Sequence, residues 1–221
     1  MVEVTLGAAT ATRIEESYEP NFDAKVFFPD WTPDVVRDHG GWMSPNHYDE
    51  ASGWLKLSIH SWLLKLGGKT ILIDTCVGNH KPRKHRPKWD MMNTPYLERL
   101  KAAGVTPDQV DMVMCTHLHV DHVGWNTRLE NGQWVPTFPN AKYVMSRTDH
   151  DHWAALAKKP DTEVYQVNTY NDSVLPIVEA KKAEFVSGEH AMCGCFKLKP
   201  APGHTPTGTS CRLPHVPGIE W

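Results

Sequence analysis

The chain has 221 residues, of which 40 % are hydrophobic and 22 % charged, and its formal net charge is −3. This composition is typical of a folded globular protein, and the length suits one sizeable domain or two small ones. The slightly acidic net charge predicts no nucleic-acid partner. A helix that spans a membrane needs about 20 apolar residues, and no apolar run approaches that length, so we expect no membrane partner.

The amino terminus and the cysteines indicate a reducing compartment. Residues 1–5 have neither the basic segment nor the apolar core of a secretory signal. The five cysteines are an odd number and lack the spacing of a disulfide framework. We therefore expect reduced thiols and a cytoplasmic protein.

The first 50 residues predict an edge strand followed by an arm. Residues 2–15 carry Thr and Val in weak alternation, which is typical of a strand at a sheet edge. Residues 19–50 are rich in Pro, Asp, Trp and Gly and predict a long irregular arm, a kind of segment that often serves as a lid. Its aromatic side chains could line an apolar pocket or pack the arm onto the body, and burial is the commoner use. They are Phe27, Phe28, Trp31 and Trp42.

A β-hairpin follows the arm. Residues 54–66 are mostly apolar, Gly67 and Gly68 supply a turn, and residues 70–74 form a second apolar run that ends at Asp74. His60 lies inside the first strand and has no partner at ligand spacing, so we expect it to pack rather than to bind a metal.

A basic segment comes after Gly78 and contains Lys81, Arg83, Lys84, Arg86 and Lys88. It could bind an anionic substrate or an acidic partner. We favour a solvated loop, because no aromatic residues alternate with the charges as they do in single-strand binders.

A helix and a strand then complete a β-α-β unit. Residues 95–103 have helical spacing of apolar residues, with Thr94 as the expected N-cap and Gly104 as the stop. Residues 110–114 form a short apolar run that predicts a buried strand.

Residues 115–126 hold the densest group of metal-ligand side chains in the chain. His117, His119, Asp121 and His122 stand within six residues, directly after the predicted strand. In an extended chain His117, His119 and Asp121 point to one side, while His122 can serve a neighbouring position. Imidazole and carboxylate are the usual ligands of zinc and related divalent ions, and four such groups suit two adjacent ions better than one.

The remaining elements are less distinct. Residues 134–139 predict a turn-rich connection, residues 142–145 a strand, and residues 171–185 a helix opened by Asn171 or Asp172. Between them, Thr148 or Asp149 is the expected N-cap of a further helix. His150 and His152 have the residue type and spacing of metal ligands, but we interpret them as the polar start of that helix.

The spacing H-x-H-x-D-H after a strand resembles the metallo-β-lactamase superfamily. Residues 200–206 read Pro-Ala-Pro-Gly-His-Thr-Pro and resemble a second loop of that family, after a candidate strand at 196–199. Residues 72–75, Leu-Ile-Asp-Thr, resemble a third segment of that family, a strand that ends in an aspartate. The resemblance implies an α/β fold, a four-layer αββα sandwich of two mixed sheets, as a single domain over residues 1–221.

The resemblance also implies the site. His117, His119 and His204 would hold a first zinc ion, and Asp121 and His122 a second, with other divalent metals possible. Asp74 would support the ligands from behind, and Asp121 would act in catalysis by steering the proton of the attacking water.

The end of the chain departs from the family pattern. No aspartate follows Asp172, and residues 207–221 form an atypical tail without a strand or helix period. The family pattern has a bridging aspartate and a last histidine there, so we expect a truncated chain that lacks the last part of the second half and holds one zinc more readily than two. An uncovered sheet edge favours association, so we expect a homo-oligomer.

The resemblance is nearest to the lactonase and organophosphate-hydrolase branch. It implies a hydrolase that uses a metal-bound hydroxide on a small-molecule substrate with an ester-type bond: a lactone, an aryl ester or a phosphotriester. Two alternatives stay open. One is a β-lactam-hydrolysing enzyme, and the other is a truncated, non-catalytic metal-binding remnant.

Overall fold

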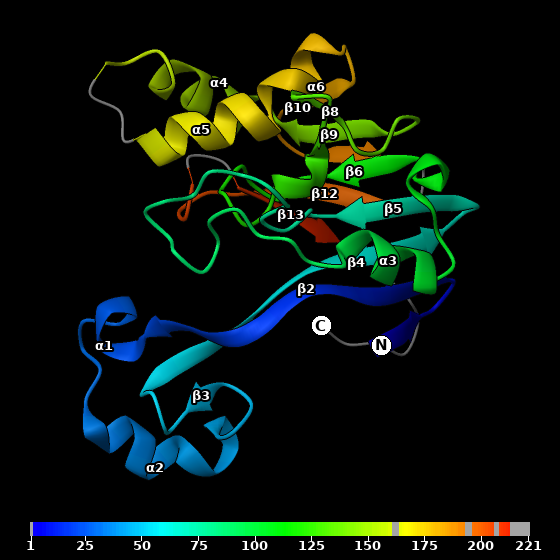
Figure 1. The fold of residues 1–221 in the computed structure, drawn as a ribbon. Helices are drawn as coiled ribbons and strands as arrows, with labels where there is room; N and C mark the ends of the chain where they lie inside the picture. Colours follow the sequence, from blue (N-terminus) through cyan, green and yellow to red (C-terminus); the bar gives the residue numbers. More distant parts are fainter. Residues whose placement is uncertain (1, 161–163, 193–195, 206–207, 213–221) are drawn as a thin grey trace.

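The computed structural model describes residues 2–160, 164–192, 196–205 and 208–212. Its main feature is a mixed sheet of eight strands in the order β1-β2-β4-β5-β6-β9-β10, with β3 paired to β4 (Figure 1). The strands are β1 (Val2–Leu6), β2 (Ala9–Asp23), β3 (Tyr48–Asp49), β4 (Trp54–Leu66), β5 (Lys69–Ile73), β6 (Met112–Met114), β9 (Lys142–Ser146) and β10 (Ala183–Val186).

The strand directions decide where loops from different parts of the chain meet. The strands β5, β6, β9 and β10 pair in parallel, whereas β1, β2, β4 and β5 pair antiparallel. The carboxyl ends of β5 and β6 therefore lie at one edge of the sheet, as ligand-binding loops do in open α/β sheets.

The two faces of the sheet are covered by different layers. Leu72, Val113 and Tyr143 face the helices, while Ile71, Met114 and Val144 alternate with them and face a second, small sheet. The helices are α3 (Tyr96–Ala102), α4 (Arg147–Leu156), α5 (Val164–Ser173) and α6 (Leu175–Glu179). The antiparallel small sheet consists of β11 (His190–Met192), β12 (Phe196–Ala201) and β13 (Gly208–Arg212).

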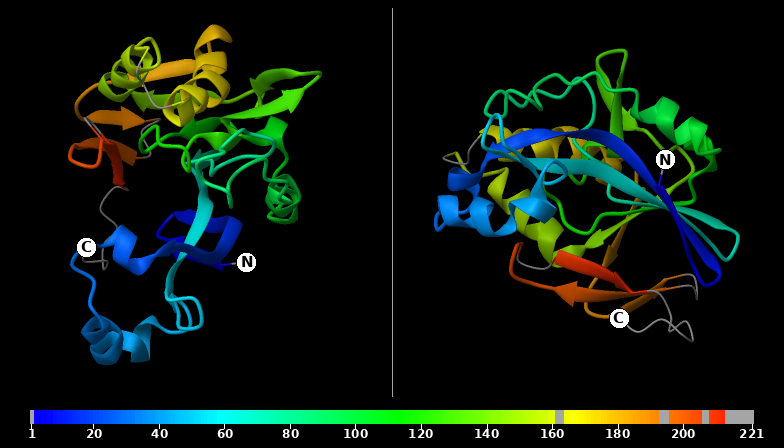
Figure 2. Two further views of the ribbon diagram at one scale, coloured as in Figure 1. Left: turned by 60° about the vertical axis from the view of Figure 1, so that its left-hand side comes forward. Right: turned by 90° about the horizontal axis from the view of Figure 1, so that it is seen from below.

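Met192 and Leu198 of the small sheet pack into the same apolar cluster as the far face of the large sheet. Figure 2 shows the helices and the small sheet on either side of the large one. The expected α/β class with stacked sheets is therefore confirmed. Within the described ranges, no helix forms an outer layer over the small sheet.

The arm at residues 19–50 is more regular than predicted. It begins with the end of β2 and contains α1 (Ala24–Phe27) and α2 (Pro33–Met43). Pro33 at the first position favours this helix, but Gly40 and Gly41 weaken its sequence signal, which is why it was not expected. In Figure 1 the arm projects from the body at the ends of β2 and β4.

The expected packing of the arm's aromatic residues is wrong for most of them. Phe27, Phe28 and Trp42 are 45 %, 49 % and 64 % exposed. Trp31 packs against the small cluster of Ala24, Met43 and Leu55, where the arm meets β4. The arm therefore presents apolar rings to solvent.

Several helix and strand boundaries differ from those predicted. Residues 171–185 are not one helix, since α5 ends at Ser173, α6 is short, and the apolar run 183–186 pairs with β9 as a strand. Residues 134–139 belong partly to a hairpin of β7 (Thr127–Glu130) and β8 (Gln133–Pro136). The N-caps of α3 and α4 are Pro95 and Ser146.

The basic segment is not simply a solvated loop. Lys81 and Arg83 are fully buried, and both contact Asp172 at the end of α5. The Arg83 guanidinium donates to both carboxylate oxygens of Asp172, at 2.7 and 2.8 Å. Lys84, Arg86 and Lys88 remain exposed. The charge run thus hides a buried ion cluster that neither sequence interpretation anticipated.

The tail at residues 207–221 is partly more regular than predicted. Residues 208–212 form β13 and pair with β12, although the sequence shows no strand period there. Residues 207 and 213–221 lie outside the described residues. None of the described helices combines the length and the apolar character that crossing a membrane requires.

Candidate metal centre

Strand ends bring the predicted site residues together. Asp74 directly follows β5, residues 115–122 follow the parallel neighbour β6, and His204 follows β12 of the small sheet. The backbone N–H of Asp74 donates to the carbonyl of Met114 at 2.9 Å, which ties the ends of β5 and β6 to each other.

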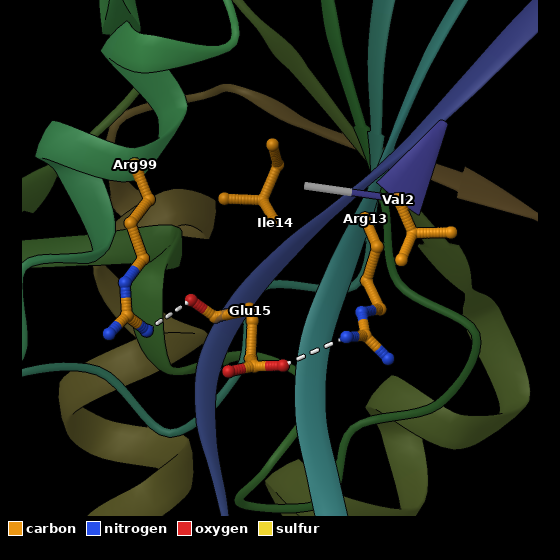
Figure 3. A pocket seen from close by; sticks show the side chains of 5 residues that line it. All are labelled: Val2, Arg13, Ile14, Glu15 and Arg99. Atoms are coloured by element: carbon orange, nitrogen blue, oxygen red, sulfur yellow. Dashed lines mark hydrogen bonds and ion pairs between the residues drawn. The ribbon is translucent and has the colours of Figure 1, made fainter. Parts of the chain in front are cut away.

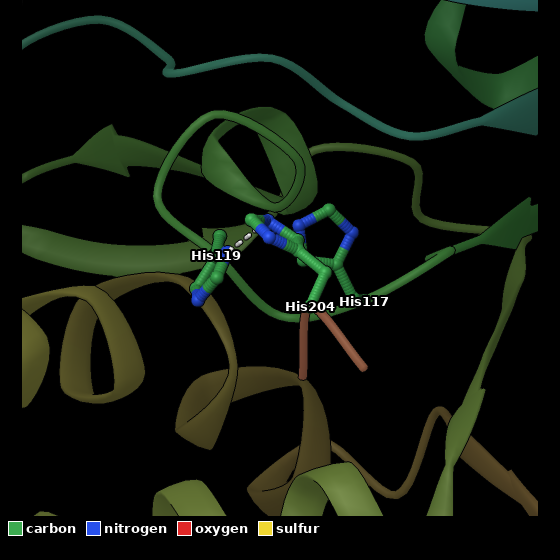
Figure 4. A group of neighbouring side chains, drawn as sticks. All are labelled: His117, His119 and His204. Atoms are coloured by element: carbon green, nitrogen blue, oxygen red, sulfur yellow. Dashed lines mark hydrogen bonds between the residues drawn. The ribbon is translucent and has the colours of Figure 1, made fainter. Parts of the chain in front are cut away.

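Three histidines form the most compact group. One ring nitrogen from each of His117, His119 and His204 lies within 4.8 Å of the other two. Figure 4 shows the three rings turned toward a common point. His119 Nδ1 and His204 Nε2 are 3.0 Å apart, and His117 Nε2 is buried with no hydrogen-bond partner among the described residues. Buried polar atoms are normally satisfied, so this orphaned nitrogen marks a place for a ligand.

Asp74 holds the loop that carries these histidines. Its carboxylate accepts hydrogen bonds from the backbone N–H and the hydroxyl of Thr116, both at 2.7 Å. It also accepts from His122 Nδ1 at 2.8 Å. Because a carboxylate only accepts, Nδ1 carries the proton and His122 Nε2 is left for another partner. That Asp74 supports metal ligands stays a prediction.

Asp121 and His122 form a pair beside the three histidines. His122 Nε2 lies 3.4 Å from Asp121 Oδ2, and the rings of His117 and His122 have centroids 3.9 Å apart. The predicted residues of both metal positions thus share one site, although among the described residues only His117, His119 and His204 converge closely enough to form a three-ligand group.

The electrostatics separate these two groups. Burial, followed by the neighbouring imidazoles, lowers the pKa of His117 to about 3, and burial together with His204 lowers the pKa of His119. Burial alone would also lower the pKa of His122, but its contacts with Asp121 and Asp74 outweigh burial and raise that pKa to about 10. His117 and His119 are therefore neutral near pH 7, which is the form that binds a metal.

Asp149 is a site residue that sequence reasoning did not identify. It is fully buried in α4, and its Oδ2 accepts the backbone N–H of Leu118, the residue between His117 and His119, at 2.9 Å. We had expected Asp149 only as a helix cap, because its position in the sequence gives no sign of a contact with a loop 31 residues away.

His150 and His152 lie outside the group of three histidines. His150 contacts Asp151 at 2.9 Å and the Tyr170 hydroxyl at 3.3 Å. His152 is exposed on α4. His60 contacts Ser58 in its own strand, which agrees with its predicted packing role.

The family model described as the Metallo-beta-lactamase superfamily matches residues 55–216. Among curated proteins, the N-acyl homoserine lactonase AiiB of Agrobacterium fabrum is 27 % identical over 95 residues, which cover 37 % of this chain and 33 % of that protein. The same lactonase of Rhizobium rhizogenes gives the same identity and coverage. The match thus spans about a third of the length of these curated relatives.

Two solved structures show how far the fold likeness extends. The hydrolase AbOPH of the beta lactamase superfamily has a TM-score of 0.76 and 24 % identity, over 96 % of this chain and 69 % of that one. AidC, described as a dizinc quorum-quenching lactonase in complex with a product, has a TM-score of 0.74 and 21 % identity, over 98 % of this chain and 71 % of that one. At these identities the likeness is one of fold.

Proposed function

The chain belongs to the metallo-beta-lactamase superfamily, and from this premise we propose that it is a metal-dependent hydrolase of small molecules with ester-type bonds, lactones first. One observation carries the proposal. Three imidazoles from two sheets converge, and the buried Nε2 of His117 has no partner among the described residues. Converging imidazole nitrogens of this kind are the usual donor set of a zinc site.

The residues present fit a divalent metal such as zinc. His117, His119 and His204 would hold a first ion, and Asp121 and His122 would contribute to a second. A bound ion of this kind lowers the pKa of water to about 7 and polarises a scissile carbonyl or phosphoryl oxygen. Three nitrogen ligands also leave a position open, as catalytic zinc sites require.

The chain's own residues prepare the site for this chemistry. Asp74 fixes the orientation of His122, and Asp149 fixes the loop between His117 and His119. Asp121 stands beside His122 Nε2, where its carboxylate can take a proton from an attacking water. Asp121 is therefore the residue we assign to proton transfer.

The substrate class rests on relatives. The curated matches are lactonases, and the structural neighbours include a lactonase with product and the hydrolase AbOPH. Because the curated matches span about a third of those proteins, the substrate remains a proposal for this chain. Lactones, aryl esters and phosphotriesters are the substrates to test first.

A second candidate is a metal-binding chain without catalytic activity. It is favoured by the second metal position, for which the described residues supply Asp121 and His122 and no further converging ligand. Metal stoichiometry and turnover together separate the two candidates, because a dinuclear hydrolase binds about two ions and turns over, whereas a binding-only chain does not turn over.

The test combines metal analysis with hydrolysis of an N-acyl homoserine lactone, an aryl ester and a phosphotriester, with a β-lactam as the comparison substrate. We expect His119→Ala and His204→Ala to lose the first zinc ion and all activity. Asp121→Asn should retain the first ion and lose turnover. His152→Ala, an exposed histidine on α4, is the matched control and should change neither. A wild-type chain that binds no zinc would refute the proposal.

A further inference from the structure

Glu16 is a buried carboxylate whose place in the metal centre is not evident from sequence. It lies on β2 and is 2 % exposed. The pairing of β2 with β4 shifts register at this residue, since Glu15 pairs with His60 and Ser17 with the adjacent Ile59. A bulge of this kind re-aims a side chain out of the regular alternation of a strand.

Three N–H groups converge on this carboxylate. Val77 N donates to Oε2 at 2.8 Å, and Gly78 N donates to Oε1 at 3.0 Å. The indole Nε1 of Trp125 donates to Oε1 at 2.6 Å. Burial raises the pKa of Glu16, and these hydrogen bonds counteract the rise. The carboxylate therefore joins β2 to two separate loops.

Arg99 of α3 fixes the same point of β2 from the helix side. Its Nη1 donates to the carbonyls of Glu15 and Glu16, at 2.7 and 3.0 Å. Figure 3 shows Arg99 reaching the backbone at Glu15, while the Glu15 side chain turns away to Arg13. The backbone that carries Glu16 is thus anchored on both sides.

The two loops held by Glu16 lead to the candidate metal centre. Val77 and Gly78 follow Asp74, and Trp125 follows His122. The loops also bond to each other: Thr75 N donates to His122 O at 2.8 Å, and Gly124 N donates to Cys76 O at 2.7 Å. A Cβ at Gly124 would lie 1.9 Å from the Val77 carbonyl carbon, so the two backbones touch directly.

The loop after β5 has a backbone that needs such support. Asp74 and Cys76 have φ angles of 57° and 53°, in the left-handed region that non-glycine residues rarely adopt. Such residues persist only where the surrounding contacts impose the conformation. The bonds from Val77 and Gly78 to Glu16 are among the contacts that hold this loop.

We propose that Glu16 is a positioning residue of the metal centre: it fixes the Asp74–Gly78 loop against the His122–Trp125 loop, and so sets the Asp74–His122 contact. This inference rests on the proposed function, because it assigns a role within the same site. It differs from a general packing role in one respect. Loss of Glu16 should disturb His122 and leave the three-histidine group in place.

The experiment uses the full chain, two test variants, two control variants, and His122→Gln to assign the NMR signal. Glu16→Gln removes one acceptor oxygen, and Trp125→Phe keeps an aromatic ring but removes the N–H donor. Glu15→Gln is the matched control, because the Glu15 carboxylate is half-buried and accepts a hydrogen bond from Arg13, away from the loops that Glu16 holds. Ile14→Ala, on the same strand, is the control for lost packing without lost hydrogen bonds.

The first measurement is the proton NMR signal of the His122 Nδ1–H in the metal-free chain, assigned by its loss in His122→Gln. A hydrogen bond to a carboxylate moves this signal downfield, so wild type, Glu15→Gln and Ile14→Ala should show it. Glu16→Gln and Trp125→Phe should lose or shift it. The second measurement is the affinity for a second zinc ion, by chelator competition, which should fall about 10–100-fold in Glu16→Gln and not in Glu15→Gln, while the affinity for the first ion stays at the wild-type value.

The outcomes separate this inference from the proposed function. If Glu16→Gln folds and retains both the downfield signal and the wild-type zinc affinity, the inference is wrong while the proposed function stands. If Ile14→Ala changes the signal as much as Glu16→Gln does, Glu16 acts only through general packing and the inference is also wrong. If wild type binds no zinc, the proposed function fails, and the NMR signal still decides whether Glu16 positions His122.

Discussion

The buried ion cluster at Asp172 offers a direct test of what joins α5 to the segment after Gly78. Asp172 lies at the end of α5 with a side chain 7 % exposed, and it faces the fully buried Lys81 and Arg83. Its Oδ1 also accepts from the Ser173 hydroxyl at 2.6 Å. The perturbation is Asp172→Asn, which keeps the size of the side chain and removes its charge.

The expected cost follows from the two cations. Arg83 stays protonated at any ordinary pH, so the substitution leaves it charged and buried without a counter-charge. Burial lowers the pKa of Lys81 to about 7, so Lys81 can release its proton and relieve part of the cost. Removing one partner of a buried pair destabilises by about 3–5 kcal/mol. For a chain of this length, that corresponds to a fall in Tm of roughly 6–20 °C.

Urea unfolding and thermal melting of the full chain measure this cost. The matched control is Glu130→Gln, which breaks a partly exposed pair with Arg128 at 3.0 Å and should change stability by about 0–1 kcal/mol. If Asp172→Asn unfolds within about 1 kcal/mol of wild type with the same m-value, the cluster is not the structural clamp that its geometry indicates.

Three further predictions concern the loops, the pH dependence and the metal. Gly124→Ala should destabilise by about 1–3 kcal/mol or more in urea unfolding, because its Cβ would overlap the backbone of Val77. Burial lowers the pKa of Lys81 from 10.5 to about 7, so between these pH values Lys81 is protonated in the unfolded chain and largely neutral in the folded one. The free energy of unfolding should therefore rise as the pH increases from 7 to 10.5, and urea unfolding should show a smaller rise in Lys81→Met. Zinc at 100 times its dissociation constant should stabilise wild type by about 2.7 kcal/mol, and thermal melting should show no such gain in His204→Ala.

The sequence alone predicted the parts of the site that depend on local signals. His117 and His119 follow a short apolar run, His204 stands in a Pro-Gly-His-Thr-Pro loop, and Asp74 follows four apolar or β-branched residues. The strands β4, β5 and β9 were equally clear, because glycine turns and unbroken apolar runs mark their ends. These features need only neighbouring residues to be recognised.

The parts that were missed depend on partners far away in the chain. Glu16 contacts residues 61, 62 and 109 positions away, and Arg83 contacts Asp172 across 89 positions. No local pattern distinguishes Glu16 from the half-buried Glu15 beside it. The error at residues 171–185 has a different cause: the single expected helix crosses Pro176, where α6 begins, and includes residues 183–185, which pair with β9. Tertiary pairing overrode helical spacing there.

The candidate metal centre is assembled by two independent pieces of structure, and this decides how each part responds to change. Asp74 and the loop of residues 115–122 follow adjacent parallel strands, so the large sheet alone brings them together. His204 arrives from the small sheet, which packs on the opposite face of the large sheet through Leu198 and Met192. The three-histidine group therefore requires both sheets to dock correctly, whereas the Asp74–His122 contact requires only the large sheet and the loops that Glu16 holds. Disturbing the packing between the sheets should therefore weaken the first metal position while leaving Asp74 and His122 in contact.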